Sequence, residues 1–172
     1  MKINKQILIG THNDGKFREI SKLLSNKFKK ISPKTLNIKA PKETGKTFKS
    51  NSELKANYFF KKSKIVSLSD DSGLEISALD NQPGIYSARW AKKHGNFKKA
   101  MKNILKSIKT NKNRKAKFIC SLSIKLYYEK IVTVIGKIQG KISYKILGTK
   151  GFGYDPIFIP DRSSVTFGQM NI

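Results

Sequence analysis

Apolar and polar positions alternate along the first half of the chain in a way that predicts a strand and then helices. The apolar run QILIG at 6–10 ends in the polar segment THNDGK, which indicates a buried strand leading into a loop. From about Gly15 the apolar residues recur at helical spacing, which predicts an amphipathic helix; they are Phe17, Ile20, Leu23, Leu24 and Phe28. A second helix is expected from Ser50 to Lys64, because Ser50 and Glu53 have the spacing of a capping box.

The second half of the chain combines helical and strand-like periods. Apolar residues at 65–68 and 74–78 flank the polar segment SDDSG, which predicts two strands joined by an acidic turn. Helical spacing returns at 97–108. From Ala116 the period becomes two, which predicts a long half-buried strand; its expected inward face is Phe118, Cys120, Leu122, Ile124 and Leu126. Glu129 and Lys130 can turn the chain, and the β-rich run at 131–142 is the expected hairpin partner of that strand.

These elements predict an α/β fold class with mixed α+β character, in which helices flank a mixed β-sheet. The chain has 172 residues and shows no internal repeat and no linker, so we expect a single domain over 1–172. Hydrophobic residues make up 38% of it and aromatic residues 10%, which is enough apolar material for a core and excludes the class of disordered chains.

The charge balance is strongly basic, with 36 Lys and Arg against 11 Asp and Glu and a formal net charge of +25. Such an excess favours a nucleic-acid or other polyanionic partner. Only four of the basic residues are arginines, however, and specific base readout and bidentate phosphate contacts favour arginine. The lysines are also spread over every segment. A solvated lysine-rich surface therefore explains the charge better, and binding of nucleic acid is kept as the alternative hypothesis.

No membrane segment or targeting signal is evident in the pattern. The N-terminal apolar stretch is too short for a secretory signal, and lysines interrupt every apolar run before the roughly 18 to 20 residues that span a bilayer. The single cysteine, Cys120, excludes an internal disulfide and every Cys-rich zinc site. We therefore expect a cytoplasmic protein that has no membrane partner.

Two loop segments carry groups that suit a phosphate-bearing, base-containing ligand. Segment 11–16 lies between a predicted strand and a predicted helix, where backbone N–H groups and a lysine favour phosphate; it consists of Thr11, His12, Asn13, Asp14, Gly15 and Lys16. It lacks the Walker A pattern, and its alternative interpretation is an ordinary Asn-Asp-Gly turn. Segment 151–156 combines two glycines with Phe152 and Tyr154, whose rings can stack on a base; the alternative is a rigid turn.

Acidic residues elsewhere suit a divalent cation. Asp70 and Asp71 are adjacent carboxylates, which can hold Mg²⁺ and leave coordination positions for water and phosphate. Roughly 0.7 such pairs are expected by chance in this composition, so a plain acidic turn is the alternative. Glu43, before the second helix, can add a carboxylate or belong to an ordinary helix start. His12 and His94 have no partner spacing for a metal site or a catalytic triad.

Five motifs follow one another along the chain. They are T-x-N-x-x-K-x-x-E at 11–19, ETGKTF at 43–48, SDDSGLEISAL at 69–79, PGIYSARWA at 83–91 and GFGYDPIF at 151–158. Together they resemble the Ham1 family of non-canonical purine nucleoside triphosphate pyrophosphatases. The matches cover nearly the whole chain, and the longer ones are specific.

The resemblance implies hydrolysis of ITP, dITP and XTP to the monophosphate and pyrophosphate with Mg²⁺. It also implies a homodimer, and an elongated mixed sheet whose two lobes flank a central cleft. The site residues that it implies are Thr11, His12, Asn13, Asp14, Gly15 and Lys16 for the triphosphate, with Lys16 also neutralising developing charge; Glu43 and Asp71 for the metal, with Asp71 also activating water; Ser72 for the substrate; and Phe152, Gly153, Tyr154 and Asp155 for the nucleoside.

The sequence departs from the family pattern at two places. His12 stands where the family usually has a small residue. The pattern also continues past T-F-x-x-M with a lysine and a Ser-His-Arg motif that grip the keto base, whereas this sequence stops at 172. We therefore expect a Ham1-like domain truncated at its C-terminus, whose residual activity discriminates poorly between ITP and ATP.

Overall fold

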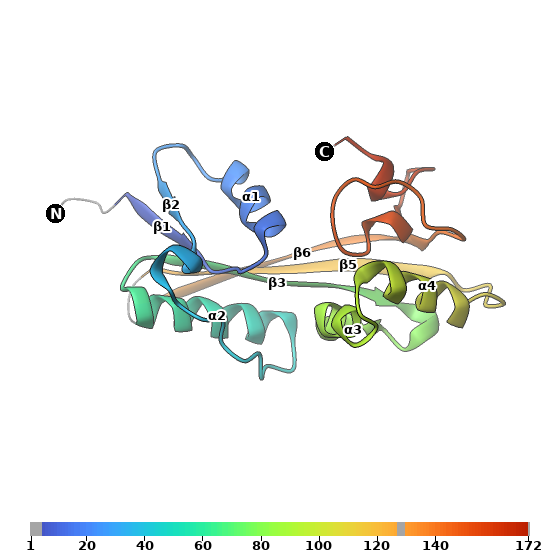
Figure 1. The fold of residues 1–172 in the computed structure, drawn as a ribbon, viewed down its shortest axis with the longest axis horizontal. Helices are drawn as coiled ribbons and strands as arrows, with labels where there is room; N and C mark the ends of the chain where they lie inside the picture. The colour runs from blue at the N-terminus through green and yellow to red at the C-terminus, as the bar shows by residue number, and fades with distance from the viewer. Residues whose placement is uncertain (1–4, 127–129, 172) are drawn as a thin grey trace. The chain divides into compact units, whose positions relative to one another are not determined.

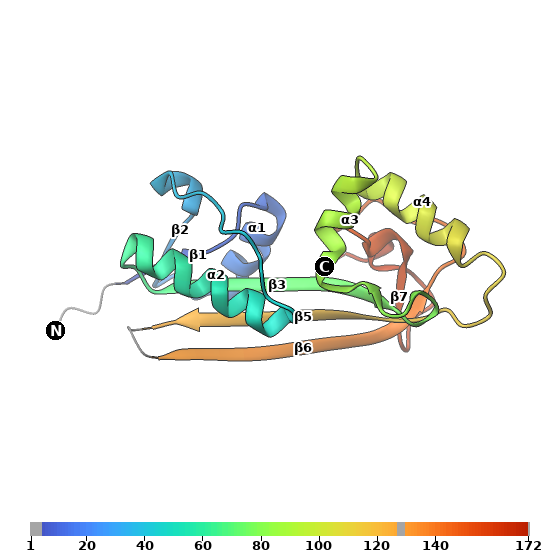
Figure 2. The ribbon, with the colours of Figure 1, turned by 90° about the horizontal axis from the view of Figure 1, so that it is seen from below.

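The computed structural model describes residues 5–126 and 130–171. Within these residues seven strands form one mixed sheet in the order β2-β1-β3-β5-β6-β7, with β4 paired to β3. The strands are β1 Gln6–Ile9, β2 Lys29–Ile31, β3 Ser67–Ile76, β4 Gln82–Pro83, β5 Lys115–Lys125, β6 Ile131–Ile142 and β7 Phe158–Pro160 (Figures 1 and 2). The helices are α1 Asp14–Leu23, α2 Phe48–Ser63, α3 Ser87–Lys93 and α4 Phe97–Ser107. The predicted class, a mixed sheet with flanking helices, is confirmed.

The chain divides into two compact units. The first contains the residues up to Asp71 together with Ser121–Ile135, and the second contains Ser72–Cys120 together with the residues from Gly136 onward. Strands β3, β5 and β6 contribute residues to both units.

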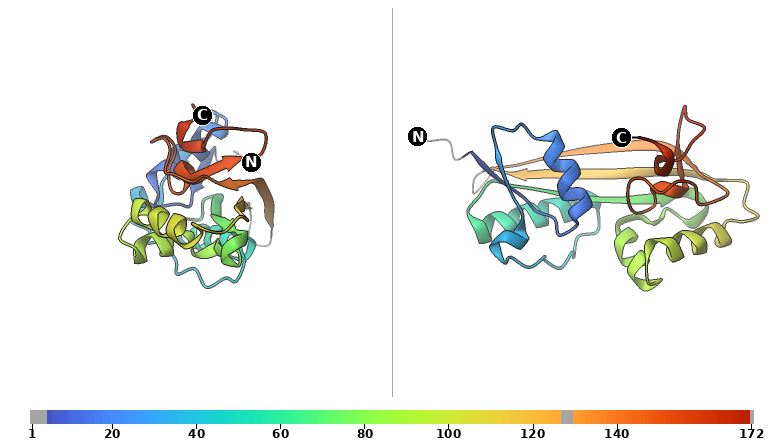
Figure 3. Two further views of the ribbon diagram at one scale, coloured as in Figure 1. Left: turned by 90° about the vertical axis from the view of Figure 1, so that its right-hand side faces the viewer. Right: turned by 45° about the horizontal axis from the view of Figure 1, so that its top comes forward.

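In the first unit β1 lies between β2 and β3, and it pairs in parallel with both. Parallel strands are buried on both faces and therefore read as continuous apolar runs, as β1 does. Helices α1 and α2 lie on opposite faces of this part of the sheet (Figures 1 and 3). The apolar core on the α1 side contains Ile7, Ile9, Ile20 and Leu68, with Phe17, Leu24, Val66, Leu122 and Ile124 packed against them.

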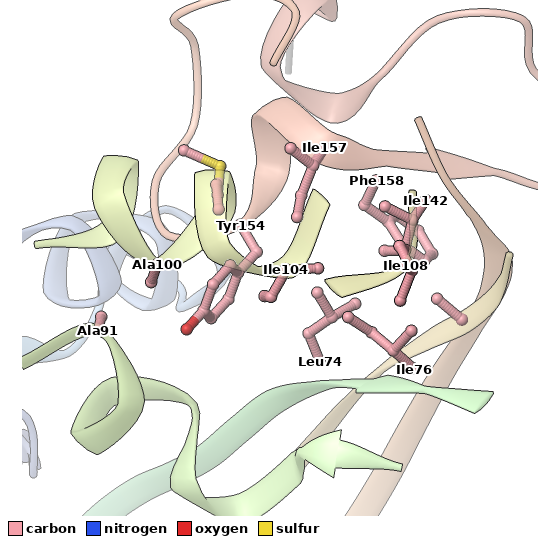
Figure 4. Packing of buried hydrophobic residues seen from close by; sticks show 12 residues of the cluster. Leu74, Ile76, Ala91, Ala100, Ile104, Ile108, Ile142, Tyr154, Ile157 and Phe158 are labelled. Carbon is pink, nitrogen blue, oxygen red and sulfur yellow. The ribbon is translucent and has the colours of Figure 1, made fainter. Parts of the chain in front are cut away.

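The second unit has its own apolar core (Figure 4). Helices α3 and α4 pack on each other there, and strand and loop residues complete the cluster. Its buried members are Leu74, Ile76, Ala91, Ala100, Met101, Ile104, Ile108, Ala116, Ile142, Tyr154, Ile157 and Phe158. The helical period predicted at 97–108 thus places one face of α4 in this core.

Helix α2 begins earlier than predicted. It starts at Phe48, with Thr47 as the N-cap residue. The capping box joins Thr47 to Ser50, because the Thr47 hydroxyl accepts from the Ser50 amide and the Ser50 hydroxyl accepts from the Thr47 amide, each at 3.0 Å. Ser50 therefore occupies the third helical position rather than the cap, and the predicted Ser50–Glu53 box is wrong. Helix α3 was also missed, since the turn residues before it dominated the pattern.

The predicted acidic turn between two strands is wrong as well. β3 runs without interruption from Ser67 to Ile76 and carries Asp70 and Asp71 in its middle. Both carboxylates are buried, at 4% and 5% exposure. Buried charges are tolerated when they are paired, and each has a lysine partner from another element. The local sequence shows the charges and does not show the partners.

The predicted inward face of β5 is confirmed for Phe118, Leu122 and Ile124, which pack against the two cores, and is wrong for Cys120. Cys120 is exposed, although it was expected in the core. Within the first unit both faces of β5 are covered: Leu122 and Ile124 pack on the α1 side, while Ser121 and Ser123 are fully buried on the other. Both serine hydroxyls lie within hydrogen-bond distance of a serine of α2, Ser52, at 2.8 and 2.7 Å. A strand pattern with alternating apolar and polar residues predicts one buried face and one exposed face. β5 departs from this pattern in the first unit, because both of its faces are covered there.

The second long strand, β6, has the bounds that the sequence predicted. β5 and β6 are neighbours in the sheet, and the Leu126 amide donates to the Lys130 carbonyl at 3.2 Å. The predicted turn residue Glu129 lies outside the described residues. Among the described helices, none is long and apolar enough to cross a membrane.

Two glycines of β6 provide a matched test of packing in the second unit. A Cβ on Gly140 would overlap the Ile159 carbonyl and lie 2.8 Å from Phe158 Cζ, whereas a Cβ on Gly136 would meet nothing within 4 Å. We expect Gly140→Ala to destabilise the fold by about 1–3 kcal/mol, because β7 must move. Gly136→Ala should be neutral or slightly stabilising, since it restricts the unfolded chain. Thermal unfolding of both variants measures this, and equal melting temperatures would contradict it.

Candidate active site

Segment 11–16 leads from β1 into α1 in the first unit. Asn13 is the N-cap of α1, and its side-chain oxygen accepts from the amides of Gly15 and Lys16 at 2.9 and 3.2 Å. The Asn13 amide in turn donates to the Thr11 hydroxyl at 3.2 Å. Two of the backbone donors that were expected to face a phosphate are therefore occupied by Asn13. The contribution of this loop to an anion site rests on the Lys16 ammonium and on the helix dipole.

The other two residues of this loop point to partners of their own. The exposed Asp14 forms an ion pair with Lys34 at 2.5 Å, and this hydrogen bond lowers the pKa of the Asp14 carboxyl. His12 is exposed, and its Nε2 lies 3.0 Å from the Ile38 carbonyl oxygen. These contacts hold segment 11–16 against the Pro33–Leu36 turn and the residues that follow it.

Lys16 reaches the first of the two adjacent carboxylates. Its Nζ lies 2.6 Å from Asp70 Oδ2, and both side chains are largely buried. Lys16 thus connects the beginning of α1 to the middle of β3. Asp70 has the role of a counter-ion that holds the lysine in place, which the sequence did not reveal.

Asp71 belongs to a different cluster, together with Glu43 and Lys55. Lys55 Nζ lies 2.8 Å from Glu43 Oε1 and 3.8 Å from Asp71 Oδ1. Lys55 comes from α2, and Glu43 from the loop before it. The structure therefore brings together the two carboxylates that the resemblance assigned to the metal, although they are 28 positions apart in the sequence.

The separation of Asp70 from Asp71 follows from strand geometry. Successive side chains of a strand point to opposite faces of the sheet. Asp70 accordingly pairs with a lysine of α1, and Asp71 with a lysine of α2. The adjacent carboxylates do not act as one bidentate metal site, as the predicted acidic turn would have allowed.

Burial raises the pKa of the Asp71 carboxyl to about 6. The negative charge of Glu43 also raises this pKa. The positive charges of Lys55 and Lys16 and the Asn51 side chain act in the opposite direction and lower it. A carboxyl that ionises near pH 6 is matched to proton abstraction from water near neutral pH. It also gains much from a cation that would stabilise its charged form.

The Glu43 and Asp71 carboxylates fit a hard divalent cation. Mg²⁺ is usually held by one or two carboxylates and completes its shell with water and substrate phosphates. Asp71 Oδ2 is buried and makes no hydrogen bond within the described residues, so it has acceptor capacity to spare. In that part of the chain no cluster of three or more His, Cys, Asp or Glu side chains suits a metal.

The remaining predicted residues belong to the second unit. Ser72 follows Asp71 on β3 and is half-buried. Asp155 closes the loop before β7, because its Oδ2 accepts from the Phe152 amide at 2.8 Å. Gly151 has a φ of +71°, and a Cβ there would overlap the Asp155 carboxylate. This glycine is therefore required by the loop that presents the half-buried Phe152.

Tyr154 has a structural position rather than the predicted one. It is 2% exposed and lies among the core residues drawn in Figure 4. Its hydroxyl donates to the Ser87 carbonyl at 3.0 Å, and its ring meets that of Phe97 edge-on. A ring so buried is not open to a base, so the expectation that Tyr154 stacks on the nucleoside is wrong for this structure. Phe152 is the aromatic residue of the segment that stays accessible.

Sequence reasoning missed Lys55, because one lysine among so many is inconspicuous by composition. The available signal was its position. Phe48, Ser52, Lys55 and Phe59 recur at helical spacing, so Lys55 lies on the face of α2 that buries the two phenylalanines. A lysine on the apolar face of a helix requires a buried partner, and here it has two.

Comparison with known proteins identifies the family of the chain. The family model of the Ham1 family matches residues 7–172. The chain belongs to the Ham1 family. Proteins named dITP/XTP pyrophosphatase are similar to it along most of their length. The one from Caulobacter vibrioides is 39% identical over 167 residues, which cover 96% of this chain and 86% of the relative. The one from Bartonella quintana is 41% identical over 177 residues, which cover 98% and 82%.

Solved Ham1 structures share the fold of this Ham1-family chain. The Ham1 protein of Staphylococcus aureus has a TM-score of 0.85 at 31% identity, over 96% of this chain and 86% of that one. A HAM1 protein from Coxiella burnetii has a TM-score of 0.87 at 29% identity, over 96% and 87%. The resemblance that the five motifs indicated is confirmed.

The raised pKa of Asp71 predicts how stability depends on pH. The folded value near 6 exceeds the ordinary value of 3.8, so the folded state holds this proton more tightly and loses stability as pH rises from about 4 to above 6. Asp71→Asn removes this penalty. With a chelator present at pH 7.5, we expect the free energy of unfolding of Asp71→Asn to exceed that of the parent chain by up to roughly 3 kcal/mol, which raises its melting temperature by several degrees. Near pH 4 the two melting temperatures should be equal.

Asp80→Asn is the matched control for this comparison. It makes the same charge change at an exposed residue whose left-handed backbone suits asparagine, so it should show no such pH dependence. Adding Mg²⁺ at pH 7.5 should stabilise the parent chain and leave Asp71→Asn unaffected. If the melting temperatures of the parent chain and of Asp71→Asn differ by the same amount from pH 4 to 7.5, burial does not raise the pKa of Asp71 as described.

Proposed function

We propose that this chain hydrolyses non-canonical purine nucleoside triphosphates, namely ITP, dITP and XTP, to the monophosphate and pyrophosphate with Mg²⁺. The observation that carries the proposal is the Glu43–Lys55–Asp71 cluster in a Ham1-family fold. It supplies paired carboxylates and a base of suitable pKa. The names of the relatives supply the substrate class.

Phosphoryl transfer needs positioning and charge neutralisation more than covalent chemistry from the protein. Lys16 supplies a held positive charge at the beginning of α1. When a triphosphate replaces Asp70 as the partner of the Lys16 ammonium group, Lys16 neutralises the charge that develops on the phosphoryl oxygens. Asp70 keeps the ammonium oriented in the absence of substrate.

Asp71 is the proposed general base. Its carboxyl is mostly ionised at pH 7.5, because its pKa lies near 6, and its burial keeps it poorly solvated. It accepts the proton of the attacking water while Lys55 limits repulsion between Asp71 and Glu43. A bound Mg²⁺ would neutralise phosphate charge and lower the pKa of water, and Glu43 and Asp71 are the residues that would hold it.

Nucleoside recognition is assigned to Phe152, Gly153 and Asp155, with Ser72 as a further substrate contact. Phe152 offers an aromatic surface, and Asp155 holds the loop that carries it. Tyr154 supports the same loop from the core. We also propose that the protein is a cytoplasmic homodimer, as the family resemblance implies.

The proposal predicts the products of the reaction. Purified protein with Mg²⁺ should release pyrophosphate and IMP from ITP, and chelation of the metal should abolish the release. Asp71→Asn should lower kcat by at least about 100-fold, because it removes the base and a metal ligand while preserving the volume. Product analysis by ion-exchange chromatography measures both expectations. Release of orthophosphate alone would contradict the reaction assigned.

A second candidate function is binding of a polyanion, and one observation favours it. A groove of about 510 Å³ in the second unit is lined by four exposed lysines and no acidic residue: Lys112, Lys115, Lys141 and Lys145. Absence of nucleotide hydrolysis, combined with salt-sensitive retention on DNA, would favour this function over the first.

The role of Lys16 can be tested against a lysine on the same helix. Lys16→Ala should reduce kcat/KM for ITP by roughly 10- to 100-fold, because one charge that neutralises the triphosphate is lost. Lys22→Ala changes the net charge equally at an exposed position in the last turn of α1 and should leave the kinetics unchanged. Equal kinetics for the two variants would make the Lys16–Asp70 pair purely structural.

A further inference from the structure

Asn51 of α2 is a fully buried polar residue to which the proposed chemistry gives no role. Its side-chain oxygen accepts from the Gly45 amide at 2.8 Å. Gly45 lies two residues after Glu43, in the loop that brings Glu43 to Lys55. This hydrogen bond therefore fixes the loop that carries one of the two carboxylates.

The approach of this loop to α2 is very close. A Cβ on Gly45 would lie 2.5 Å from Asn51 Oδ1 and 2.9 Å from the Asn51 amide nitrogen. Side chains do not tolerate such distances, so the contact requires glycine at 45 and a short side chain at 51. The loop and the helix are thus fitted to each other at this residue.

The other end of the carboxamide faces the second carboxylate. Asn51 Nδ2 and Asp71 Oδ2 are both buried, and neither makes a hydrogen bond within the described residues. The Asn51 side chain nevertheless lies at the Asp71 carboxyl and lowers its pKa as a hydrogen-bond donor does, although the two atoms do not meet at the geometry of a full hydrogen bond. Because a buried donor without a hydrogen bond is costly, the Asn51 NH₂ group beside this buried acceptor is placed to hold the Asp71 carboxylate in one orientation.

Helical spacing places Asn51 and Lys55 on one face of α2, because they are four residues apart. Lys55 contacts both Glu43 and Asp71. Asn51 likewise has one end toward the Glu43 loop and the other toward Asp71. Two successive turns of α2 therefore connect the same two segments, one by charge and one by a neutral carboxamide.

We propose that Asn51 is a positioning residue that sets the Glu43 and Asp71 carboxylates for a divalent cation, its oxygen holding the Glu43 loop and its NH₂ group orienting Asp71. The inference rests on the proposed function, since it assigns the cation to these two residues. Groups that orient metal ligands typically change metal affinity by 10- to 100-fold when they are removed.

Asn51→Ala tests the inference, and Ser52→Ala is its control. Ser52 is the adjacent residue, is equally buried, and bonds to Ser121 and Ser123 instead of the carboxylates. We expect Asn51→Ala to raise the Mg²⁺ concentration at half-maximal rate by at least 10-fold with saturating ITP. It should raise the midpoint of Mg²⁺-dependent thermal stabilisation, measured without nucleotide, by a similar factor. Ser52→Ala should lower the melting temperature and leave both Mg²⁺ midpoints unchanged.

Gly45→Ala provides a second variant that leaves Asn51 intact and displaces the loop. It should shift both Mg²⁺ midpoints in the same direction, and it decides the question if Asn51→Ala does not fold. Unchanged midpoints in the folded variants would overturn the positioning role while pyrophosphate release by the parent chain still supports the proposed function. If the parent chain shows neither release nor stabilisation by Mg²⁺, both proposals fail.

Discussion

The site depends on one constraint, which is that β3 passes through the core as an uninterrupted strand while it carries two adjacent aspartates. A strand cannot turn both side chains to one face, so each buried carboxylate needs a partner on its own side of the sheet. Lys16 of α1 serves one and Lys55 of α2 serves the other. Both flanking helices are thereby tied to the same two residues of the sheet, and the proposed chemistry divides between phosphate neutralisation by Lys16 and the Glu43–Asp71 carboxylate pair.

Much of the candidate site could be predicted from the sequence, because Lys16, Glu43 and Asp71 stand in motifs of specific spacing. The structure brings Glu43 and Asp71 to the same lysine, Lys55, and the assignment of a metal to this pair stays a proposal. Lys55 and Asn51 escaped notice, because neither type is unusual in composition, and only their position on the buried face of α2 distinguishes them. The expectation that Tyr154 stacks on a base was wrong for the opposite reason, because its motif is conspicuous in the sequence. Its ring is part of the core of the second unit, whose members come from distant segments of the chain.

The elements that were predicted well are those with one buried face or a strong local signal. α4 has a single apolar stripe, and β6 has clear β-rich bounds. The failures occur where tertiary partners change the meaning of a residue. Paired lysines make SDDSG a strand, and a serine of α2 makes Ser121 and Ser123 suitable for burial. A local sequence pattern shows how polar a residue is. Whether that residue can be buried depends on the hydrogen-bond or ion-pair partners that other elements of the fold supply.

The overall charge also constrains how such a site is filled. A chain of net charge +25 repels a free divalent cation and attracts an anionic nucleotide. In the first unit, Lys16 and Lys55 already neutralise the buried acids, so a cation that binds there competes with the lysines for the charge of these carboxylates. Both effects weaken binding of the cation alone, whereas a triphosphate brings negative charge that compensates the ammonium groups. The charge distribution therefore favours entry of the cation together with the nucleotide as a net-negative complex.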